Sequence, residues 1–483
     1  MKISTIKKAA LIALFWIFVW QIISMAVGKE LIVPSPYSAF KSFSELITSA
    51  SFYRDAFATI FRCVVGMSLS FIVGLFTALL SYRFSIVRSL LSLPVLIFKA
   101  TPVMAVILFL LLVLTSANVP VFVCFLMCYP IVYTNLLSGF DHIERQHIEL
   151  SKFYHLSGLD MIRFVFLPSV MPQISASLNL IAGLSWKTVV AAEVLASPRF
   201  SMGYNLFTAK VYLETAHLFA WIISIVCFSL LFEKIIKQIV KQFQAKPYAK
   251  SKVLMRGSAG HGSTGRGSTG RGSAGRVGSA QAFGQDGTPE IEVSGLSKRF
   301  GEKVVFSDFS ECFPSGQTTA VMAPSGYGKT TLLRMIAGLE KPDEGTISGI
   351  DPDQMSYLFQ ESRLFPWLNA FDNIALFMKN KMPAGEIEGQ VTKMLDALEL
   401  TGSMHHLPYQ LSGGMKHRVA VGRAFLYPAS VLLLDEPFKG LDAELKSRVI
   451  SNLRANYTDN KTILLVTHNQ EDADNLSNKQ IVL

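Results

Sequence analysis

Long apolar segments fill the first half of this 483-residue chain and constrain its fold more than any other feature. A bilayer core of about 30 Å needs roughly 20 helical residues, and a helix satisfies its own backbone polar groups inside lipid. Six windows meet this requirement: residues 9–27, 57–81, 90–114, 118–138, 170–197 and 214–236. Half of all residues are hydrophobic and only 17% are charged. The sequence therefore predicts about six transmembrane helices.

The first window, residues 9–27, also has features of a signal peptide, because a basic start precedes its apolar core. Its apolar stretch is long for a signal peptide, and no small-x-small cleavage site follows it cleanly. A retained membrane span is therefore the favoured interpretation.

The net charge of +10 comes largely from basic residues beside the apolar windows. They cluster at residues 2–8 and 234–252, with more in the segments 82–89 and 141–169. Basic residues mark cytoplasmic flanks, so six spans would leave both termini in the cytoplasm. This predicts a multi-pass protein in the lipid of the cytoplasmic (inner) membrane, and it argues against nucleic acid as a partner.

A Gly/Ser-rich segment separates the apolar half from a more polar half. Residues 257–276 are four pentapeptides, GSAGH, GSTGR, GSTGR and GSAGR. Such a repeat has nothing to bury and is expected to form a flexible linker, by a natural or an engineered join. The predicted domains are a transmembrane domain at 1–240, a linker at 241–288 and an α/β domain at 289–483.

The α/β domain contains a phosphate-binding loop after a predicted strand at residues 318–322. Glycines there let backbone N–H groups turn towards phosphates, a lysine supplies a cation, and the Thr330 hydroxyl can bind Mg²⁺. The first glycine of the usual pattern is Ala323, which is tolerated if its φ is negative. The nucleotide-binding residues expected here are Ser325, Gly326, Gly328, Lys329, Thr330 and Thr331.

Four further motifs follow this loop in a fixed order. They are Gln360 in Leu358-Phe359-Gln360-Glu361, then Leu411-Ser412-Gly413-Gly414, Asp435-Glu436 after a run of four apolar residues, and His468 after a strand. Together with the phosphate loop, this order resembles the ATP-binding cassette ATPases. The resemblance implies an α/β P-loop fold with a helical subdomain that binds ATP and Mg²⁺.

The resemblance also implies a role for each motif. Glu436 would be the general base that polarises the hydrolytic water, and His468 would sense the γ-phosphate. Asp435 and Gln360 would join Thr330 in holding Mg²⁺, and Gln360 would also reach the attacking water. Ser412, Gly413 and Gly414 would close over the γ-phosphate bound to a second copy of the chain. Two departures are Met415, where Gln is commoner, and Lys439-Gly440, where Ser-Ala is usual.

Phe300 is the candidate for stacking on adenine. An aromatic residue at this place in ATP-binding cassettes has that role, although an isolated Phe near a strand is more often part of the core. This assignment rests on the resemblance.

The polar segment 141–169 resembles the cytoplasmic coupling loop of bacterial binding-protein-dependent permeases. That loop carries Glu-Ala-Ala, then a Gly, then Leu-Pro, and its short helix docks on the ATPase. Here Ser151 replaces the second Ala and His155 replaces the Gly. The coupling residues expected are Glu149, Gly158 and Pro168. Residues 129–135 and 183–193 further resemble the nitrate/sulfonate/taurine permeases.

Four residues within the apolar windows are candidates for a transport path: Lys99, Trp186, Lys187 and Glu193. An ionised group in a membrane span costs a few kcal/mol, roughly 2.5–3.5 at the centre. The charged residues either line the path or serve as snorkelling or structural ion-pair groups, and both interpretations remain open. Lys187 and Glu193 are six residues apart, roughly 240° around a helix. Any partner of either is therefore expected on another span.

The combined resemblance implies ATP-driven import of a small, anionic solute such as a sulfonate, taurine or nitrate. Such a chain would act as a homodimer with a separate extracytoplasmic solute-binding protein. The alternatives are an exporter of the same superfamily and a membrane-anchored ATPase for mechanotransmission. Exporters usually have long cytoplasmic helical extensions, and mechanotransmission ATPases a large extracytoplasmic domain; neither pattern is found in this sequence.

Overall fold

The computed structural model describes residues 2–245, 290–324 and 326–482. The chain divides into two compact units. The first contains Met1–Ile143 and Phe166–Pro247, and the second contains Glu144–Val165 and Tyr248–Leu483. The segment 144–165, which the sequence boundaries assign to the membrane domain, thus packs with the α/β domain.

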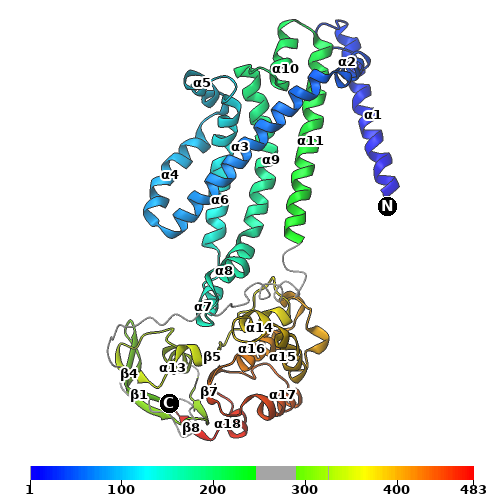
Figure 1. The fold of residues 1–483 in the computed structure, drawn as a ribbon. Helices are drawn as coiled ribbons and strands as arrows, with labels where there is room; N and C mark the ends of the chain where they lie inside the picture. Colours follow the sequence, from blue (N-terminus) through cyan, green and yellow to red (C-terminus); the bar gives the residue numbers. More distant parts are fainter. Residues whose placement is uncertain (1, 246–289, 325, 483) are drawn as a thin grey trace, which may run out of the picture. The chain divides into compact units, whose positions relative to one another are not determined.

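The described residues of the first unit form helices joined by short connections, with no strand among them (Figure 1). Its helices are α1 (Lys2–Val27), α2 (Pro36–Thr48), α3 (Ala50–Arg83), α4 (Ser85–Ala100), α5 (Val103–Val113), α6 (Val119–Asp141), α9 (Leu167–Ala196), α10 (Met202–Val211) and α11 (Thr215–Ala245).

Helix α6 packs closely against both α3 and α9. Two glycines on α3 make the approach to α6 tight. A Cβ added to Gly66 would lie 2.7 Å from Cys124 Cβ, and one added to Gly74 would lie 2.7 Å from Val132 Cγ1. Small residues at a helix interface let two backbones approach, which is a usual source of helix packing in membranes.

Four of the six expected spans coincide with helices long and apolar enough to cross a membrane. These are Ala50–Arg83, Val119–Asp141, Gly158–Ala196 and Thr215–Gln242. The window 9–27 falls on α1, in which the apolar part Leu11–Val27 is shorter than these four. The predicted fold class, a helical membrane domain joined to an α/β P-loop domain, is confirmed.

The expected span at 90–114 is not one continuous helix. Helix α4 ends at Ala100 and α5 begins at Val103, and the two helices are bent by 107°. Pro102 lies at the break, with Thr101 before it in an extended conformation (φ −79°, ψ 127°). A proline disfavours the helical conformation of the residue that precedes it, so the helix ends there.

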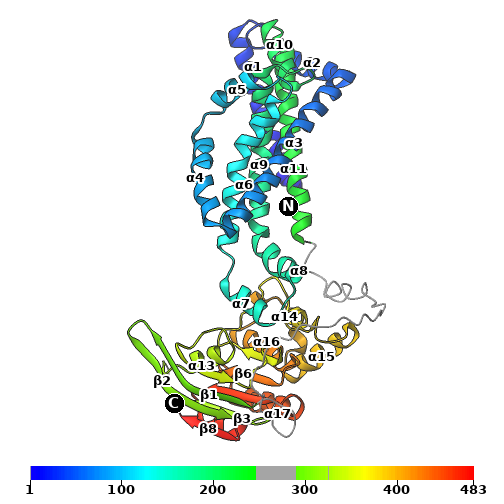
Figure 2. The same ribbon diagram turned by 60° about the vertical axis from the view of Figure 1, so that its left-hand side comes forward.

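The second unit contains two sheets and a set of helices around them (Figure 2). The larger sheet is parallel in the order β5-β6-β7-β3-β8, and the smaller is antiparallel in the order β2-β1-β4. The strands are β1 (Ile291–Phe300), β2 (Lys303–Phe313), β3 (Thr318–Met322), β4 (Glu344–Ser348), β5 (Met355–Leu358), β6 (Val431–Asp435), β7 (Thr462–Thr467) and β8 (Lys479–Val482).

The helices of this unit follow the strands in the chain. They are α13 (Lys329–Ile336), α14 (Ala370–Met378), α15 (Ala384–Ala397), α16 (Gly413–Leu426), α17 (Ala443–Tyr457) and α18 (Gln470–Leu476). Every residue of β6 and β7 is buried, as expected for central parallel strands covered on both faces.

The register of the parallel sheet determines where the site lies. Met322 at the end of β3 pairs with Thr467 of β7, and Asp435 at the end of β6 pairs with Val466. The carboxyl ends of three neighbouring strands therefore meet at one edge, where α/β sheets usually bind ligands.

Segment 144–165 forms α7 (Arg145–Phe153), α8 (Gly158–Met161) and most of a π-helical turn, Ile162–Phe166. Its apolar side chains are buried in the core of the second unit, in contact with residues of the parallel-sheet domain; they are Leu150, Phe153, Tyr154, Phe164 and Val165. The short helix that the sequence predicts in this loop is thus present, and it contributes to a hydrophobic core.

Candidate functional site

The phosphate loop connects β3 to α13, the helix whose N-cap is Gly328. Gly326 and Gly328 both have φ of +89°, a conformation that favours glycine. A Cβ on Gly328 would also lie 2.4 Å from Val305 Cγ1, so no larger residue fits there. Ala323 does not have a positive φ, which is the condition under which its replacement of glycine is tolerated. Ser325 lies outside the described residues.

Lys329 begins α13, and its ammonium donates to two carbonyl oxygens of the same loop. These are Ala323 O at 2.5 Å and Pro324 O at 3.0 Å. The cation is therefore held inside the loop, close to the N-terminus of a helix that favours anions. Thr331 follows in the first turn of the same helix.

The residues expected to hold Mg²⁺ are partly brought together. The Thr330 hydroxyl donates to Asp435 Oδ2 at 2.7 Å, and burial raises the pKa of Asp435 to about 6. A hydroxyl beside a carboxylate is an oxygen donor set that suits Mg²⁺. Gln360 lies in the exposed segment that follows β5.

Glu436 follows directly after β6 and is held at its backbone and at its carboxylate. Its φ is +51°, and its N–H donates to Val466 O at 2.9 Å. Its Oε1 lies 3.0 Å from His468 Nδ1, and its Oε2 lies 3.0 Å from Lys439 Nζ. Burial alone would raise the pKa of Glu436, but Lys439 and His468 hold that pKa below its usual value. The carboxylate is thus ionised at neutral pH, as a general base requires.

Two residues around Glu436 were missed by the sequence analysis as site residues. Lys439 was noted only as a departure from the usual Ser, and His417 was not noted. His417 Nε2 lies 3.1 Å from the backbone oxygen of Glu436, which connects α16 to the residue after β6. The departure at Lys439 was the one signal in the sequence that could have drawn attention to it.

The signature motif forms the start of α16. Ser412 is its N-cap, and the Ser412 hydroxyl accepts a hydrogen bond from Met415 N at 3.3 Å. A Cβ on Gly413 would meet open space, whereas one on Gly414 would lie 3.1 Å from Gly440 O. The first glycine therefore presents an accessible backbone, and the second packs against the turn after β6.

Phe300, the candidate for adenine stacking, ends β1 with half of its surface exposed. The Lys298 ammonium lies 5.2 Å from the ring centroid. The exposed fraction leaves the ring accessible to a flat ligand.

Glu149, which the sequence predicts to be a coupling residue, lies in α7 and pairs with two arginines of the same unit. Its Oε1 accepts from Arg334 Nη2 at 2.6 Å, and its Oε2 accepts from Arg363 Nη1 at 2.8 Å. Burial opposes ionisation, but the two guanidinium groups hold the pKa of Glu149 below its usual value. Arg334 belongs to α13, so the coupling helix contacts the helix that begins at the phosphate loop.

Arg363 lies three residues after Gln360 and is connected to the signature helix. Arg423, fully buried on α16, donates to Arg363 O at 3.2 Å and to Ser362 O at 3.0 Å. Glu149 is therefore in contact with the phosphate-loop helix and with a segment that the signature helix holds.

Further hydrogen bonds fix the coupling segment on both sides of Glu149. His147 Nε2 lies 3.2 Å from Leu364 O, the Tyr154 hydroxyl lies 3.0 Å from Ser356 Oγ, and Trp367 Nε1 donates to Phe164 O at 2.8 Å. The Lys379 ammonium pairs with Asp160 at 2.7 Å.

The other residues that the sequence predicts for the coupling loop are best described by their backbone conformation. His155, which replaces the usual Gly, has a φ of +50°, so the position does require a left-handed backbone. Gly158 begins α8 after the cap Ser157, and a Cβ there would meet nothing within 4 Å. Pro168 lies in the first turn of α9, where a proline is well tolerated.

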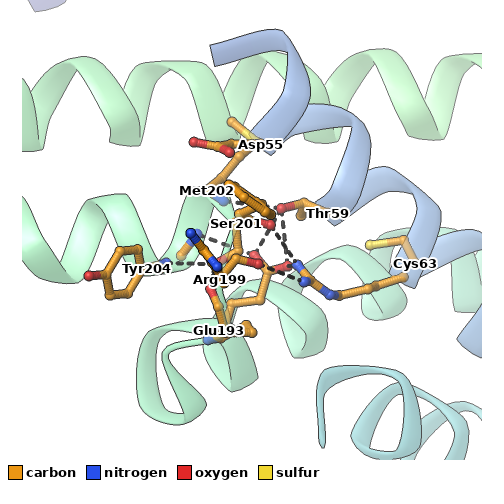
Figure 3. Close-up of polar contacts among 12 residues, drawn as sticks. Asp55, Thr59, Cys63, Glu193, Arg199, Ser201, Met202 and Tyr204 are labelled. Carbon is orange, nitrogen blue, oxygen red and sulfur yellow. Dashed lines mark hydrogen bonds and ion pairs between the residues drawn. The ribbon is translucent and has the colours of Figure 1, made fainter. Parts of the chain in front are cut away.

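In the membrane unit, Glu193 of α9 lies at the centre of a buried polar network with α3 and α10 (Figure 3). Its carboxylate accepts from Arg62 Nη1 at 2.7 Å, from Thr59 Oγ1 at 2.9 Å and from Gly203 N at 3.2 Å. The partner of Glu193 thus comes from another span, as predicted. Arg62 also donates to Phe200 O at 3.1 Å, which ties the α9–α10 connection to α3.

The remaining candidates for a transport path lie apart from this network. Lys99 of α4 donates to Thr134 Oγ1 at 3.5 Å, and Lys187 is exposed on α9. Trp186 of α9 is buried, and its ring is stacked on Phe228 of α11. Among the hydrogen bonds and ion pairs of the described residues, none joins two of the four candidates.

Comparisons with known proteins find similarity in a segment of each half of the chain. Residues 306–439 match the family model described as "ABC transporter". Residues 70–244 match the model described as "Binding-protein-dependent transport system inner membrane component". Two different family models thus match separate segments of one polypeptide, and each match covers less than half of the chain.

The curated relatives align with the second half only. The chain is 39% identical over 209 residues to the "Sulfate/thiosulfate import ATP-binding protein CysA 1" of Agrobacterium fabrum, an alignment covering 40% of this chain and 60% of the relative. It is 39% identical over 208 residues to CysA of Escherichia coli (strain K12), covering 40% and 57%. The match therefore spans less than two thirds of these relatives.

Solved structures similar to the chain include "Dimeric Structure of MJ0796, a Bacterial ABC Transporter Cassette". The sequences are 29% identical, and the match covers 40% of this chain and 94% of that one, with a TM-score of 0.37.

Proposed function

We propose that this chain is the combined membrane and motor subunit of an ATP-driven importer. The observation that carries the proposal is the contact of Glu149 with Arg334 of α13 and with Arg363. A segment that lies between two membrane helices in the sequence is thereby bonded to the helix that begins at the phosphate loop. The matches to a permease model and to import ATPases support the same function.

In the proposed ATP site, each residue acts from the position described above. The N–H groups at Gly326 and Gly328 and the ammonium of Lys329 bind the phosphates of ATP. Thr330 and Asp435 hold Mg²⁺, which, when bound, offsets the charge of the phosphate oxygens. Glu436 accepts a proton from the attacking water, which Gln360 helps to orient, and His468 contacts the γ-phosphate.

The transmission of movement follows from the contacts of α13. Its N-terminus lies at the phosphate loop, and Arg334 near its other end holds Glu149. A displacement of α13 on ATP binding would therefore act directly on α7. Arg423 gives the signature helix a second connection, through Arg363, to the same carboxylate.

The proposed working form is a homodimer. Each chain has one phosphate loop and one signature motif, and Ser412, Gly413 and Gly414 would close over ATP bound to the partner copy. A separate extracytoplasmic solute-binding protein would deliver the solute. The ATP-binding domain and both termini would be cytoplasmic, with the permease domain in the cytoplasmic membrane.

A small anion is the proposed solute class. The relatives named for sulfate and thiosulfate support an anion, as does the resemblance of residues 183–193 to the nitrate/sulfonate/taurine permeases. Lys99 and Lys187 are exposed cations on α4 and α9 that could face such a solute.

ATP hydrolysis by the full chain in nanodiscs, compared with that of Glu436→Gln, tests the proposed motor. Loss of the base should lower kcat by at least about 100-fold. Glu388→Gln, an exposed carboxylate on α15, is the matched control and should leave kcat unchanged. Full activity of Glu436→Gln would refute the assignment of the base.

Uptake of labelled sulfate, thiosulfate, taurine and nitrate by cells producing the chain together with its solute-binding protein tests the proposed import. Uptake of one anion that is lost in Glu436→Gln would support import. Hydrolysis in nanodiscs without uptake of any of the four would contradict the proposed solute class, and labelled anion leaving preloaded cells would indicate export.

A further inference from the structure

The turn after β6 brings Lys439 back towards Glu436. The N–H of Lys439 donates to Glu436 O at 3.3 Å, and Gly440 follows with a φ of +77°. A glycine adopts this left-handed conformation freely, whereas an alanine there would be strained. Gly440, which replaces the usual Ala, therefore suits the backbone of this turn.

This turn brings the side chain of Lys439 to the carboxylate of Glu436. The Lys439 ammonium lies 3.0 Å from Oε2, and His468 Nδ1 lies 3.0 Å from Oε1. The Glu436 side chain is only 14% exposed, whereas that of Lys439 is 55% exposed. Each carboxylate oxygen thus has its own basic partner: Oε1 is in a hydrogen bond with His468, and Oε2 is in an ion pair with Lys439 without a hydrogen bond among the described residues.

The backbone contacts of Glu436 do not fix the orientation of its carboxylate. Val466 O and His417 Nε2 hold the N–H and the carbonyl of Glu436, and they leave the side-chain torsions free. The terminal torsion of a glutamate is broad and is poorly restricted by rotamer preference. The orientation of the carboxylate therefore depends on Lys439 and His468.

The turn that carries Lys439 is itself fixed at its far end. A Cβ on Gly414 would lie 3.1 Å from Gly440 O, so the turn packs closely against the start of α16. The ammonium is thus presented from a supported backbone, although much of its side chain is exposed.

We propose that Lys439 is a positioning residue for the general base Glu436. By holding Oε2 while His468 holds Oε1, it keeps the carboxylate in the orientation that accepts the proton of the attacking water. The inference rests on the proposed function, in which Glu436 is that base.

The test is the steady-state ATP hydrolysis of the full chain in nanodiscs, with kcat and the KM for ATP measured separately. Lys439→Gln keeps most of the side-chain length and removes the charge, and it should lower kcat about tenfold with KM changed less than about twofold. A 1 Å misplacement of a reacting group can cost about 100-fold, which bounds the expected loss. Lys439→Arg should recover most of kcat, since it restores a cation.

The matched control is Lys393→Gln, an exposed lysine on α15, which changes the net charge equally and should leave kcat unchanged. The double variant Glu436→Gln/Lys439→Gln should be no slower than Glu436→Gln alone, because a residue that acts only through the base has no effect once the base is lost.

Three outcomes would overturn the inference: an unchanged or raised kcat in Lys439→Gln, a changed KM with unchanged kcat, or no recovery in Lys439→Arg. These outcomes are distinguishable from a failure of the proposed function. If Glu436→Gln itself hydrolyses ATP normally, the assignment of the base is wrong. If Glu436→Gln is inactive and Lys439→Gln is fully active, only the role of Lys439 is wrong.

Discussion

Glu149→Gln would remove the negative charge that α7 presents to two arginines while keeping the size of the side chain. The amide could retain one hydrogen bond, but it could not pair with both Arg334 and Arg363. Because these contacts connect α7 to the phosphate-loop helix, the substitution should weaken coupling and leave the ATP site intact.

The size of this effect follows from burial. Glu149 is 25% exposed, Arg334 is 28% exposed and Arg363 is 11% exposed, so the pairs are partly screened by water. Two pairs of this kind contribute about 0.2–1 kcal/mol each, and leaving the nearly buried Arg363 without its acceptor adds about 1 kcal/mol. The total of about 1.4–3 kcal/mol would weaken the docking of α7 roughly 10- to 150-fold.

The assay compares basal ATP hydrolysis in nanodiscs with anion uptake by cells that produce the same variant. Glu149→Gln should keep basal hydrolysis within about threefold, since no residue of the ATP site is changed, and it should lose most of its uptake. Glu144→Gln, the more exposed N-cap of the same helix, is the control and should behave like the unmodified chain. Uptake by Glu149→Gln equal to that of the control would refute the coupling role.

Two further substitutions test the packing of each unit. Burial raises the pKa of Asp372 to about 6, so the native state binds its proton more tightly than the unfolded chain, and stability falls as pH rises from about 4 to 6. Asp372→Asn should therefore stabilise the chain by roughly 1–3 kcal/mol at pH 7.5 and by little at pH 4; equal thermal unfolding midpoints at pH 7.5 would contradict this. Glu193→Gln leaves Arg62 without its charged partner and should destabilise the membrane unit by roughly 3–5 kcal/mol, measured by thermal unfolding in detergent. An unchanged unfolding midpoint with lost uptake would instead favour a transport role for Glu193.

Hydropathy predicted most of the membrane unit because it sums over many residues. The same averaging hid the break at Thr101-Pro102, where the backbone preference of two residues outweighs an apolar window of 25. The segment also lacks a charged or polar run that would divide it in the sequence. A proline within a predicted span was the local signal for this bend.

The ATP site was predicted from the order of its motifs, which resembles that of the ATP-binding cassette ATPases. Three of the motifs, namely the phosphate loop, Asp435-Glu436 and His468, lie at the carboxyl ends of neighbouring parallel strands, which end at the same edge. The structure brings Thr330, Asp435, Glu436 and His468 together in this way. It could not be predicted that Lys439 reaches Glu436, because that contact depends on the left-handed backbone of Glu436 and on the turn that follows it.

The coupling contacts show a second limit of sequence reasoning. Glu149 was predicted as a coupling residue, but its partners lie 185 and 214 residues away and belong to no motif that the sequence revealed. Only the folded core brings Arg334 and Arg363 to the same carboxylate. The conformation of His155 was easier to predict. The related permeases have a glycine at this position, which indicates the left-handed backbone that His155 adopts.

The side chains of segment 144–165 belong to the hydrophobic core of the second unit; they are Leu150, Phe153, Tyr154 and Phe164. The proposed ATPase unit therefore includes this segment in addition to residues 289–483. A polypeptide comprising residues 289–483 alone would lack these side chains and would present to water the apolar surface that they cover. In a transporter made of separate subunits, that apolar surface stays exposed until another polypeptide binds to it. Here the residues that bury it are part of the same chain and are made in equal amount. Cutting the chain at residue 289 would therefore divide a single hydrophobic core.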